Sequence, residues 1–589
     1  MFTTRFLHVL LLSSLAVAWV ELDPSLIPPV PEQLEVYSLG DPAFLPHEWL
    51  EGVIGNVANG VKFTKRDDDS SKVYAYNGDE LVGFVDKKTG ETRVYPNYAN
   101  IPAAKNPIDI KHALKIFEHG KEGFPADDTH LELIKGASLV GSTLQDTPDN
   151  GNLSRRWNDE EPESTFLTHG ILQRRIEAAN GQKFLFCGPG SQANFGVGPD
   201  NKIFSLSYRW KAAKKSGKKV KARPAEKVAQ AIKKAMEGKR RVKVKRVDTC
   251  YYDSGVKFVQ PAYRVLAESL PEDDTGNNAT GRNQILRFFP IGDELVENVF
   301  PEGPSSEEQP PVEPKDNKHT QSVRSLKPNY FEARASLYER VIKPTVTVGR
   351  YVTRNDSDQA AFLENANGFW GNLASSTSLV NFVNSQYYWA YPWLYGSSAL
   401  SFVNSVNVAL TESHGTNHLF STWKNSGSFE TVNIPSTLPS DGYGPGPSNL
   451  GQLAYWLINA CEVIPTRIDF ASDPAPLRRA FDPWWPVFRG GLHAVLGWRT
   501  SPYFSDNVAV NTATAMAQGR PVASAWLDEA HNDPVYANRP TYIGHVTGVE
   551  QPIGRPAVIY PCGRGSDKVW QVENLGRPTC LEMRYYNND

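Results

Sequence analysis

Two short apolar stretches decide the fold that the sequence predicts: VNVALTESHG at residues 406–415 and LAYWLINACE at residues 453–462. Each is an apolar run of strand length that leads to a reactive side chain, His414 in the first and Cys461 in the second. Such runs are typical of strands buried on both faces of a parallel sheet, although a buried helix gives the same pattern. GLHAVLGW at residues 491–498 has the same character, and residues 519–532 read as a helix. We therefore predict an α/β domain with a mostly parallel sheet flanked by helices.

The two reactive side chains stand where open parallel sheets carry their functional groups, beyond the carboxyl ends of the strands. A thiol beside an imidazole can act as a nucleophile, and the imidazole can protonate a departing amine. Gly415 allows a close backbone approach, and its N–H and that of Cys461 can stabilise a developing oxyanion. The sequence thus predicts a catalytic site of His414, Cys461 and Gly415, with no cofactor and no metal.

The number of cysteines supports a free thiol at this site. The chain has five cysteines, and an odd number leaves one unpaired unless a partner chain supplies a sixth. Cys187 and Cys250 fall in the N-terminal half, and Cys562 and Cys580 fall near the C-terminal end. Pairing within each of these regions is the simplest prediction for an oxidising compartment, and it leaves Cys461 free.

The first residues predict that the protein is secreted or enters a secretory or vacuolar lumen. Arg5, the apolar stretch from Phe6 to Leu15 and the small residues of Ala16-Val17-Ala18 together are typical of a signal peptide. No later run is apolar for long enough to span a bilayer. Glycan acceptors are predicted at Asn152, Asn278 and Asn355.

Composition and charge indicate a globular, multidomain chain without an affinity for nucleic acid or membrane. The 589 residues are 40% hydrophobic and carry a net charge of −3, so cores can form and no global attraction to polyanions is expected. Residues 211–246 hold sixteen Lys or Arg against two Glu, which we interpret as a solvated face rather than a polyanion site. The predicted divisions are a signal peptide (1–18), an α+β N-terminal region (19–298), a Pro/Glu-rich linker (299–329) and the α/β domain with its tail (330–589).

Two resemblances extend this prediction. The strand-like stretch at residues 184–210 and the amphipathic helix at residues 224–238 resemble PepSY-like modules of peptidase propeptides. The order of apolar run, His-Gly, apolar run and Ala-Cys resembles the caspase–gingipain–legumain group of cysteine peptidases, although Asn459-Ala460-Cys461-Glu462 is not the caspase pentapeptide. The resemblance implies a caspase-like fold, a His414/Cys461 dyad and a peptide or protein substrate. It also implies that the N-terminal region can inhibit the site within the same molecule.

Several alternatives remain open at this stage. The dyad can be inactive, with Cys461 and His414 serving only as core residues. His414 and His418 stand four residues apart, as metal ligands on a helix do, but the intervening glycine disfavours that helix. The aromatic residues of 384–396, together with Trp484 and Trp485, can bind carbohydrate if they are exposed. Glu412 and Glu462 flank the dyad and can orient His414 or bind a basic substrate group.

Overall fold

The computed structural model describes residues 20–58, 61–66, 69–111, 124–145, 163–236, 241–270, 284–293, 343–354, 356, 358–375, 379–425, 428–446, 451–504, 506–536 and 539–587. The predicted signal peptide, the predicted linker and the three predicted glycan acceptors lie outside these residues.

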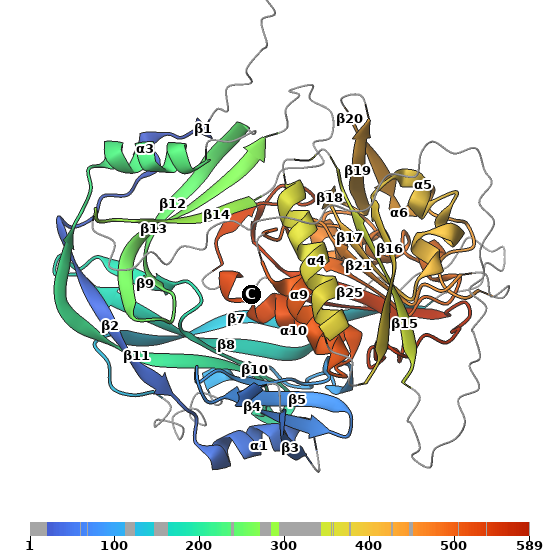
Figure 1. Ribbon diagram of the computed structural model, residues 1–589, viewed down its shortest axis with the longest axis horizontal. Helices are drawn as coiled ribbons and strands as arrows, with labels where there is room; N and C mark the ends of the chain where they lie inside the picture. Colours follow the sequence, from blue (N-terminus) through green and yellow to red (C-terminus); the bar gives the residue numbers. More distant parts are fainter. Residues whose placement is uncertain are drawn as a thin grey trace, which may run out of the picture.

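Most of the described strands belong to one 21-stranded mixed sheet that is mostly antiparallel. In the N-terminal half its strands are β1 (Val20–Glu21), β2 (Gln33–Ala43), β3 (Lys62–Arg66), β4 (Asp69–Asn77), β5 (Glu80–Asp86), β6 (Thr92–Val94), β7 (His130–Gln145), β8 (Ser164–Glu177), β9 (Lys183–Cys187), β10 (Gln192–Val197), β11 (Ile203–Lys221), β12 (Arg241–Asp253), β13 (Phe258–Leu270) and β14 (Gln284–Pro290). The described helices of this half are α1 (His47–Val57) and α3 (Ala225–Met236), with the short η1 (Pro24–Leu26), η2 (Tyr98–Asn100) and η4 (Pro199–Asn201). Figure 1 shows the long β2 and β11 curving around the left of the molecule.

The helix predicted within residues 224–238 is confirmed as α3. Val228, Ile232 and Met236 are buried, whereas the lysines of its last turn, Lys233 and Lys234, are exposed. This spacing puts one apolar stripe of the helix on the protein and leaves the charged side in solvent.

The C-terminal half contributes a parallel part of the sheet, in the spatial order β16 (Asn381–Trp389), β15 (Thr345–Val352), β17 (Val408–Glu412), β21 (Tyr455–Asn459) and β22 (Ala494–Trp498). The antiparallel β25 (Pro556–Pro561) and β26 (Cys580–Tyr586) follow β22. Helices α4 (Gln359–Ser375), α9 (Val508–Ala517) and α10 (Val522–Asn532) lie together on one face, as Figure 1 shows. The short α5 (Pro392–Tyr395), α7 (Pro476–Phe481) and α8 (Trp485–Phe488) pack on the other face. Outside this sheet lie α6 (Ile434–Thr437), η8 (Pro534–Tyr536) and the small sheets of β18 (Gly415–Thr416), β19 (Leu419–Asn425) and β20 (Ser428–Asn433), and of β23 (Thr541–Ile543) and β24 (Glu550–Pro552).

The apolar runs quoted above are strands because both of their faces are buried. Leu410 and Leu457 belong to the core under α4, α9 and α10, whereas Ala409 and Trp456 belong to the core on the opposite face. A strand that is covered on both sides has no solvated face, so its sequence does not alternate.

The sheet continues from one half of the chain into the other through β7 and β26. These strands pair antiparallel, with Tyr585 opposite Val140. Nearby, Arg93 forms buried ion pairs with Asp528 and Glu529 of α10, and the Tyr98 hydroxyl donates to Asp528 Oδ1 at 2.8 Å. The two halves are therefore joined by backbone pairing and by buried charge.

The predicted fold class, a caspase-like α/β domain after an α+β PepSY-like region, is wrong. The part of the chain that the structure describes is mainly β, with 43% strand and 23% helix, and its one large sheet is mostly antiparallel. The prediction rested on continuous apolar runs, which occur only where helices cover both faces of the sheet. The antiparallel strands that dominate the count carry many polar residues. Most pair with the next strand in sequence, as β7 does with β8 and β12 with β13, and a few pair with distant strands, as β26 does with β7.

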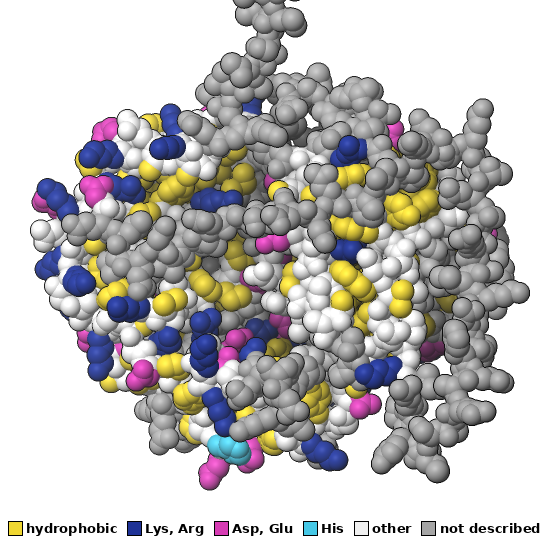
Figure 2. Space-filling view, viewed as in Figure 1, with side chains coloured by type: hydrophobic (Ala, Val, Ile, Leu, Met, Phe, Trp, Pro, Cys, Tyr) yellow, Lys and Arg dark blue, Asp and Glu magenta, His cyan; other side chains and the backbone are white. Residues whose placement is uncertain are grey.

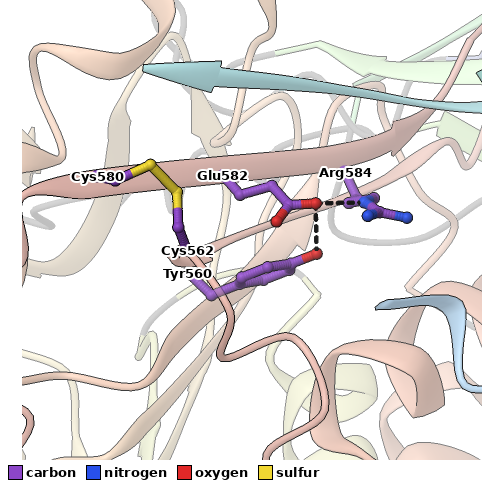
Figure 3. The surroundings of a disulfide bond; sticks show 5 residues. All are labelled: Tyr560, Cys562, Cys580, Glu582 and Arg584. Carbon is purple, nitrogen blue, oxygen red and sulfur yellow. Dashed lines mark hydrogen bonds and ion pairs between the residues drawn. A yellow bond between two sulfur atoms is a disulfide. The ribbon is translucent and has the colours of Figure 1, made fainter. Parts of the chain in front are cut away.

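Both predicted disulfides are confirmed, Cys187–Cys250 and Cys562–Cys580, and Cys461 is the free cysteine. Figure 3 shows the second disulfide near Glu582, whose Oε1 accepts from Tyr560 at 3.2 Å and from Arg584 at 2.6 Å. Two disulfides indicate an oxidising, extracellular setting.

Among the described residues, no helix combines the length and the apolar character needed to cross a membrane.

In the described parts of the basic block, residues 211–236 and 241–246, lysines lie beside acidic neighbours. Lys219 lies 3.1 Å from Glu35, and Lys243 lies 3.0 Å from Glu21. Figure 2 shows acidic side chains interspersed among the basic ones over this half of the molecule. Mixed charge of this kind is typical of an ordinary solvated surface.

Candidate functional site

His414 and Cys461 lie at the same edge of the sheet. They follow the adjacent parallel strands β17 and β21, and the last residues of these strands, Glu412 and Asn459, stand opposite each other. Each reactive residue comes two positions after its strand, so the two loops leave the sheet side by side. The arrangement is the one that the sequence predicted from the carboxyl ends of two neighbouring strands.

An acidic loop after a third strand completes the surroundings of His414. Asp356 and Asp358 follow β15, the neighbour of β17, and Asp356 Oδ2 lies 2.9 Å from His414 Nε2. Asp358 Oδ2 lies 3.9 Å from the same nitrogen. The imidazole also contacts the rings of Phe362 and Phe504 edge-on, with centroids 5.2 and 5.4 Å away. The ring is therefore held by one carboxylate and two aromatic contacts.

Sequence reasoning missed Asp356 and Asp358. The available signal was the Asp-x-Asp at residues 356–358, shortly after the apolar and β-branched VTVGRYV at residues 346–352. Recognising that run as a third parallel strand would have placed both carboxylates beside His414.

The Cys461 thiol is buried and neutral. Its residue is 2% exposed. Burial raises the pKa of the thiol to about 12, the Ser501 side chain nearby lowers it, and the charges of Glu462 and Asp358 raise the pKa further. Cys461 does not rest as a thiolate in this environment.

Asp358 and Gly415 connect the two loops. The Asp358 charge acts on the Cys461 thiol, and its carboxylate is also within reach of His414. A Cβ on Gly415 would lie 2.9 Å from both the Cys461 carbonyl oxygen and the Ala460 Cβ. The glycine thus lets the histidine loop pack directly on the cysteine loop, and its role as an oxyanion donor stays a prediction.

Glu412 and Glu462, the two carboxylates that flank the dyad in sequence, accept hydrogen bonds from other residues. Asn365 and Asn459 donate to the Glu412 carboxylate, and burial raises its pKa well above the usual range. Glu462 accepts from the Tyr542 hydroxyl at 2.5 Å and from the His545 and Val546 amides. Glu462 therefore anchors the chain around residues 542–546.

His418 turns away from His414. Its Nε2 lies 3.2 Å from the Ala480 carbonyl oxygen, and burial lowers its pKa to about 3. The structure instead groups one oxygen each of Asp356 and Asp358 with one nitrogen of His414, all within 4.8 Å of one another. Two carboxylates and an imidazole are a donor set that suits zinc or manganese.

The aromatic stretch at residues 384–396 is mostly core. Tyr387, Trp389 and Tyr395 are at most 7% exposed, and Trp484 is fully buried. Tyr388, Tyr391 and Trp393 are partly buried and pack against the core under α5, α7 and α8. These rings therefore fill the protein interior more than they line its surface.

Comparison with known proteins gives one matching domain model, over part of the chain, and no activity. Residues 348–550 match the family model described as a domain of unknown function, DUF6345. No curated protein matches the chain. A solved structure of an uncharacterized protein from Eubacterium rectale ATCC 33656 is similar at 8% identity and a TM-score of 0.27, covering 47% of this chain and 88% of that one.

The resemblance to caspase–gingipain–legumain peptidases with a PepSY-like front is wrong. The model that matches this part of the chain is that of DUF6345, and the sheet is mostly antiparallel. The resemblance rested on an apolar run before His-Gly and another before Ala-Cys, and buried strands in unrelated folds can produce such short motifs.

Proposed function

We propose that the protein is a secreted, thiol-dependent hydrolase of peptide bonds, with Cys461 as the nucleophile and His414 as the general base and acid. One observation carries the proposal. His414 and Cys461 leave adjacent parallel strands at matching positions, and the Asp356 carboxylate lies 2.9 Å from the imidazole. A nucleophile, a base and a group that orients the base are the parts that covalent acyl transfer needs.

The raised thiol pKa determines the order of proton transfers. Because Cys461 rests as a neutral thiol, His414 removes the proton while the sulfur attacks the peptide carbonyl carbon. The imidazolium formed is stabilised by Asp356, and it then gives the proton to the departing amine. This step leaves an acyl-thioester on Cys461, which water hydrolyses with His414 again acting as the base. The amides of Gly415 and Cys461 are the proposed oxyanion donors.

The substrate approaches from the side of Asp358 in this proposal. The side chains of His414 and Asp356 are 3% and 5% exposed, whereas that of Asp358 is 20% exposed. Asp358 is thus the most accessible group of the cluster, and binding of a peptide there has to open a path to the sulfur.

Replacing either member of the dyad is expected to abolish most of the activity. Cys461→Ser and His414→Asn should each lower kcat/KM on a denatured protein substrate by at least about 100-fold, since general acid–base catalysis alone contributes about that much. Assays in EDTA exclude hydrolysis through a cation at the acidic cluster, and circular dichroism checks that the variants are folded. Unchanged hydrolysis by folded Cys461→Ser, or none by the native chain, would refute the proposal.

Asp356 and Asp358 offer a matched pair that separates positioning from electrostatics. Asp356→Asn is expected to lower kcat by about 10- to 100-fold with little change in KM, because it removes the charge that orients and stabilises the imidazolium. Asp358→Asn is expected to lower the pKa of Cys461, since it removes a negative charge near the thiol. Iodoacetamide labelling of Cys461, followed by mass spectrometry between pH 7 and 10, should therefore be faster in Asp358→Asn. Equal labelling rates in this variant and the native protein would contradict the electrostatic assignment.

A further inference from the structure

Glu462, the residue directly after the proposed nucleophile, has a backbone conformation that non-glycine residues seldom adopt. Its φ is +47°, in the left-handed region, where the Cβ of an L-residue crowds its own backbone. Glu462 is also 1% exposed, so its carboxylate is buried together with the strained backbone. Strained residues persist only where their surroundings hold them in place. The contacts of Glu462 therefore show what fixes the chain at Cys461.

The β23–β24 hairpin, residues 541–552, holds the Glu462 carboxylate. One carboxylate oxygen accepts from the Tyr542 hydroxyl at 2.5 Å and from the His545 amide at 2.9 Å. The other oxygen accepts from the Val546 amide at 2.7 Å. Burial and the charge of Glu462 raise the pKa of Tyr542 well above its usual range, so the hydroxyl stays protonated and donates. Donors on both oxygens fix the orientation of the carboxylate, and with it the turn that follows Cys461.

The same hydroxyl also holds the loop on the other side of the thiol. The Ser501 backbone amide donates to the Tyr542 hydroxyl oxygen at 2.8 Å. The Ser501 side chain lowers the pKa of Cys461, whereas the charge of Glu462 raises it, so both residues lie close enough to act on the sulfur. Cys461 follows β21, and Ser501 follows the adjacent parallel strand β22. The Tyr542 hydroxyl thus joins two neighbouring loops at the edge of the sheet that carries the thiol.

Another buried tyrosine shows the same kind of hydrogen bond far from this edge. The Tyr560 hydroxyl donates to Glu582 at 3.2 Å, between β25 and β26 (Figure 3). The antiparallel register of β22 and β25 places Tyr560 beside the start of β22, whereas Ser501 follows the end of that strand. A tyrosine–glutamate hydrogen bond is therefore an ordinary structural device in this protein, and what distinguishes Tyr542 is that its partners act on Cys461.

We propose that Tyr542 is a positioning residue for the reaction of Cys461, an inference that rests on the proposed function. Its hydroxyl holds Glu462 on one side and the Ser501 amide on the other, and thereby limits the positions that the sulfur can take. A displacement of about 1 Å at a reacting group can cost on the order of 100-fold in rate. Loss of the hydroxyl should therefore slow the chemical step more than it weakens substrate binding.

Tyr542→Phe tests this role, because it keeps the ring and removes only the hydroxyl. In the full-length protein acting on a denatured protein substrate, it is expected to lower kcat by about 10- to 100-fold and to change KM by less than about twofold. Tyr560→Phe is the matched control, since it also removes the hydroxyl of a buried tyrosine from a glutamate, and it should keep the native kcat. Melting temperatures check that both variants are folded in the assay. A native kcat in Tyr542→Phe, or the same loss in both variants, would overturn the proposal.

Iodoacetamide labelling of Cys461 at pH 9 separates failure of this inference from failure of the proposed function, because labelling needs no hydrolysis. Without the Tyr542 hydroxyl, the charge of Glu462 is less dispersed and Ser501 is no longer held beside the sulfur, and both changes disfavour the thiolate. Labelling should therefore be about threefold slower in Tyr542→Phe than in the native protein, the equivalent of half a pKa unit, and unchanged in Tyr560→Phe. This labelling pattern in a protein that hydrolyses no substrate would refute the proposed function alone. Labelling of Tyr542→Phe at the native rate or faster would overturn the positioning role, whether or not the protein hydrolyses peptides.

Discussion

A chain that begins at Lys343 is expected to be insoluble or unfolded. It would lose β7, whose pairing with β26 covers residues 580–586, and would leave a long unpaired strand edge of the kind that aggregates. It would also take Arg93 away from Asp528 and Glu529, leaving Arg520 alone among the described cations within ion-pair distance of both carboxylates. Circular dichroism and gel filtration of the truncated chain measure the outcome.

The matched control is the full-length protein with a specific protease site inserted within residues 299–329 and then cut. Cutting there breaks no contact between described residues, so the two fragments are expected to elute together and to melt as one unit. The same sample tests inhibition of the thiol site by the N-terminal region, because release of inhibition should raise the activity after cutting. A truncated chain that melts at the temperature of the full-length protein would refute the shared-sheet argument.

The replacement Asp506→Asn is expected to remove a large part of the pH dependence of stability. Burial raises the pKa of Asp506 from 3.8 to about 8, and the charge of the neighbouring Asp533 adds to this. A group whose pKa is raised by folding contributes stability that is fully present below about pH 4 and is lost as the pH rises through about 8. The native protein should therefore become less stable between pH 5 and pH 9, by up to about 4 kcal/mol at about 1.4 kcal/mol per unit.

Asparagine is the suitable replacement because its amide oxygen can still accept from the Val508 amide, and its NH2 group can donate to the Tyr536 hydroxyl, as a protonated Asp506 carboxyl would. Urea unfolding midpoints should be similar for the variant and the native protein at pH 5, and clearly higher for the variant at pH 9. Asp441→Asn, at an exposed position, controls for general effects of removing a charge. A variant with the same pH profile as the native protein would show that Asp506 is ionised in the fold.

The parts of this fold that the sequence predicted are local. The runs at residues 408–412 and 455–459 reveal parallel strands because both faces are buried, and the cysteine count predicts a free Cys461. The pairing of Gln145 with Cys580 leaves no local signal, because no short-range pattern connects residues so far apart. The α/β fold class was predicted from these local apolar runs alone and was therefore wrong.

The candidate site likewise combines local features that the sequence predicts with long-range contacts that it does not. The positions of His414 and Cys461 at strand ends follow from the continuous apolar runs before them, whereas the choice of Asp356 among 65 acidic residues depends on which strand lies beside β17. The burial of Cys461 depends on packing around Ser501 and Asp358, which come from two other segments. Protonation at this site could therefore not be predicted from sequence.

Burial of Cys461 has a consequence for how long the protein survives outside a cell. The thiolate is the form that attacks peroxide and foreign disulfides, and a thiol with a pKa of about 12 is ionised in fewer than about one molecule in ten thousand near neutral pH. An ordinary exposed cysteine is ionised in several per cent of molecules under the same conditions. The Cys461 thiol can thus stay reduced in surroundings that are oxidising enough to maintain the two disulfides.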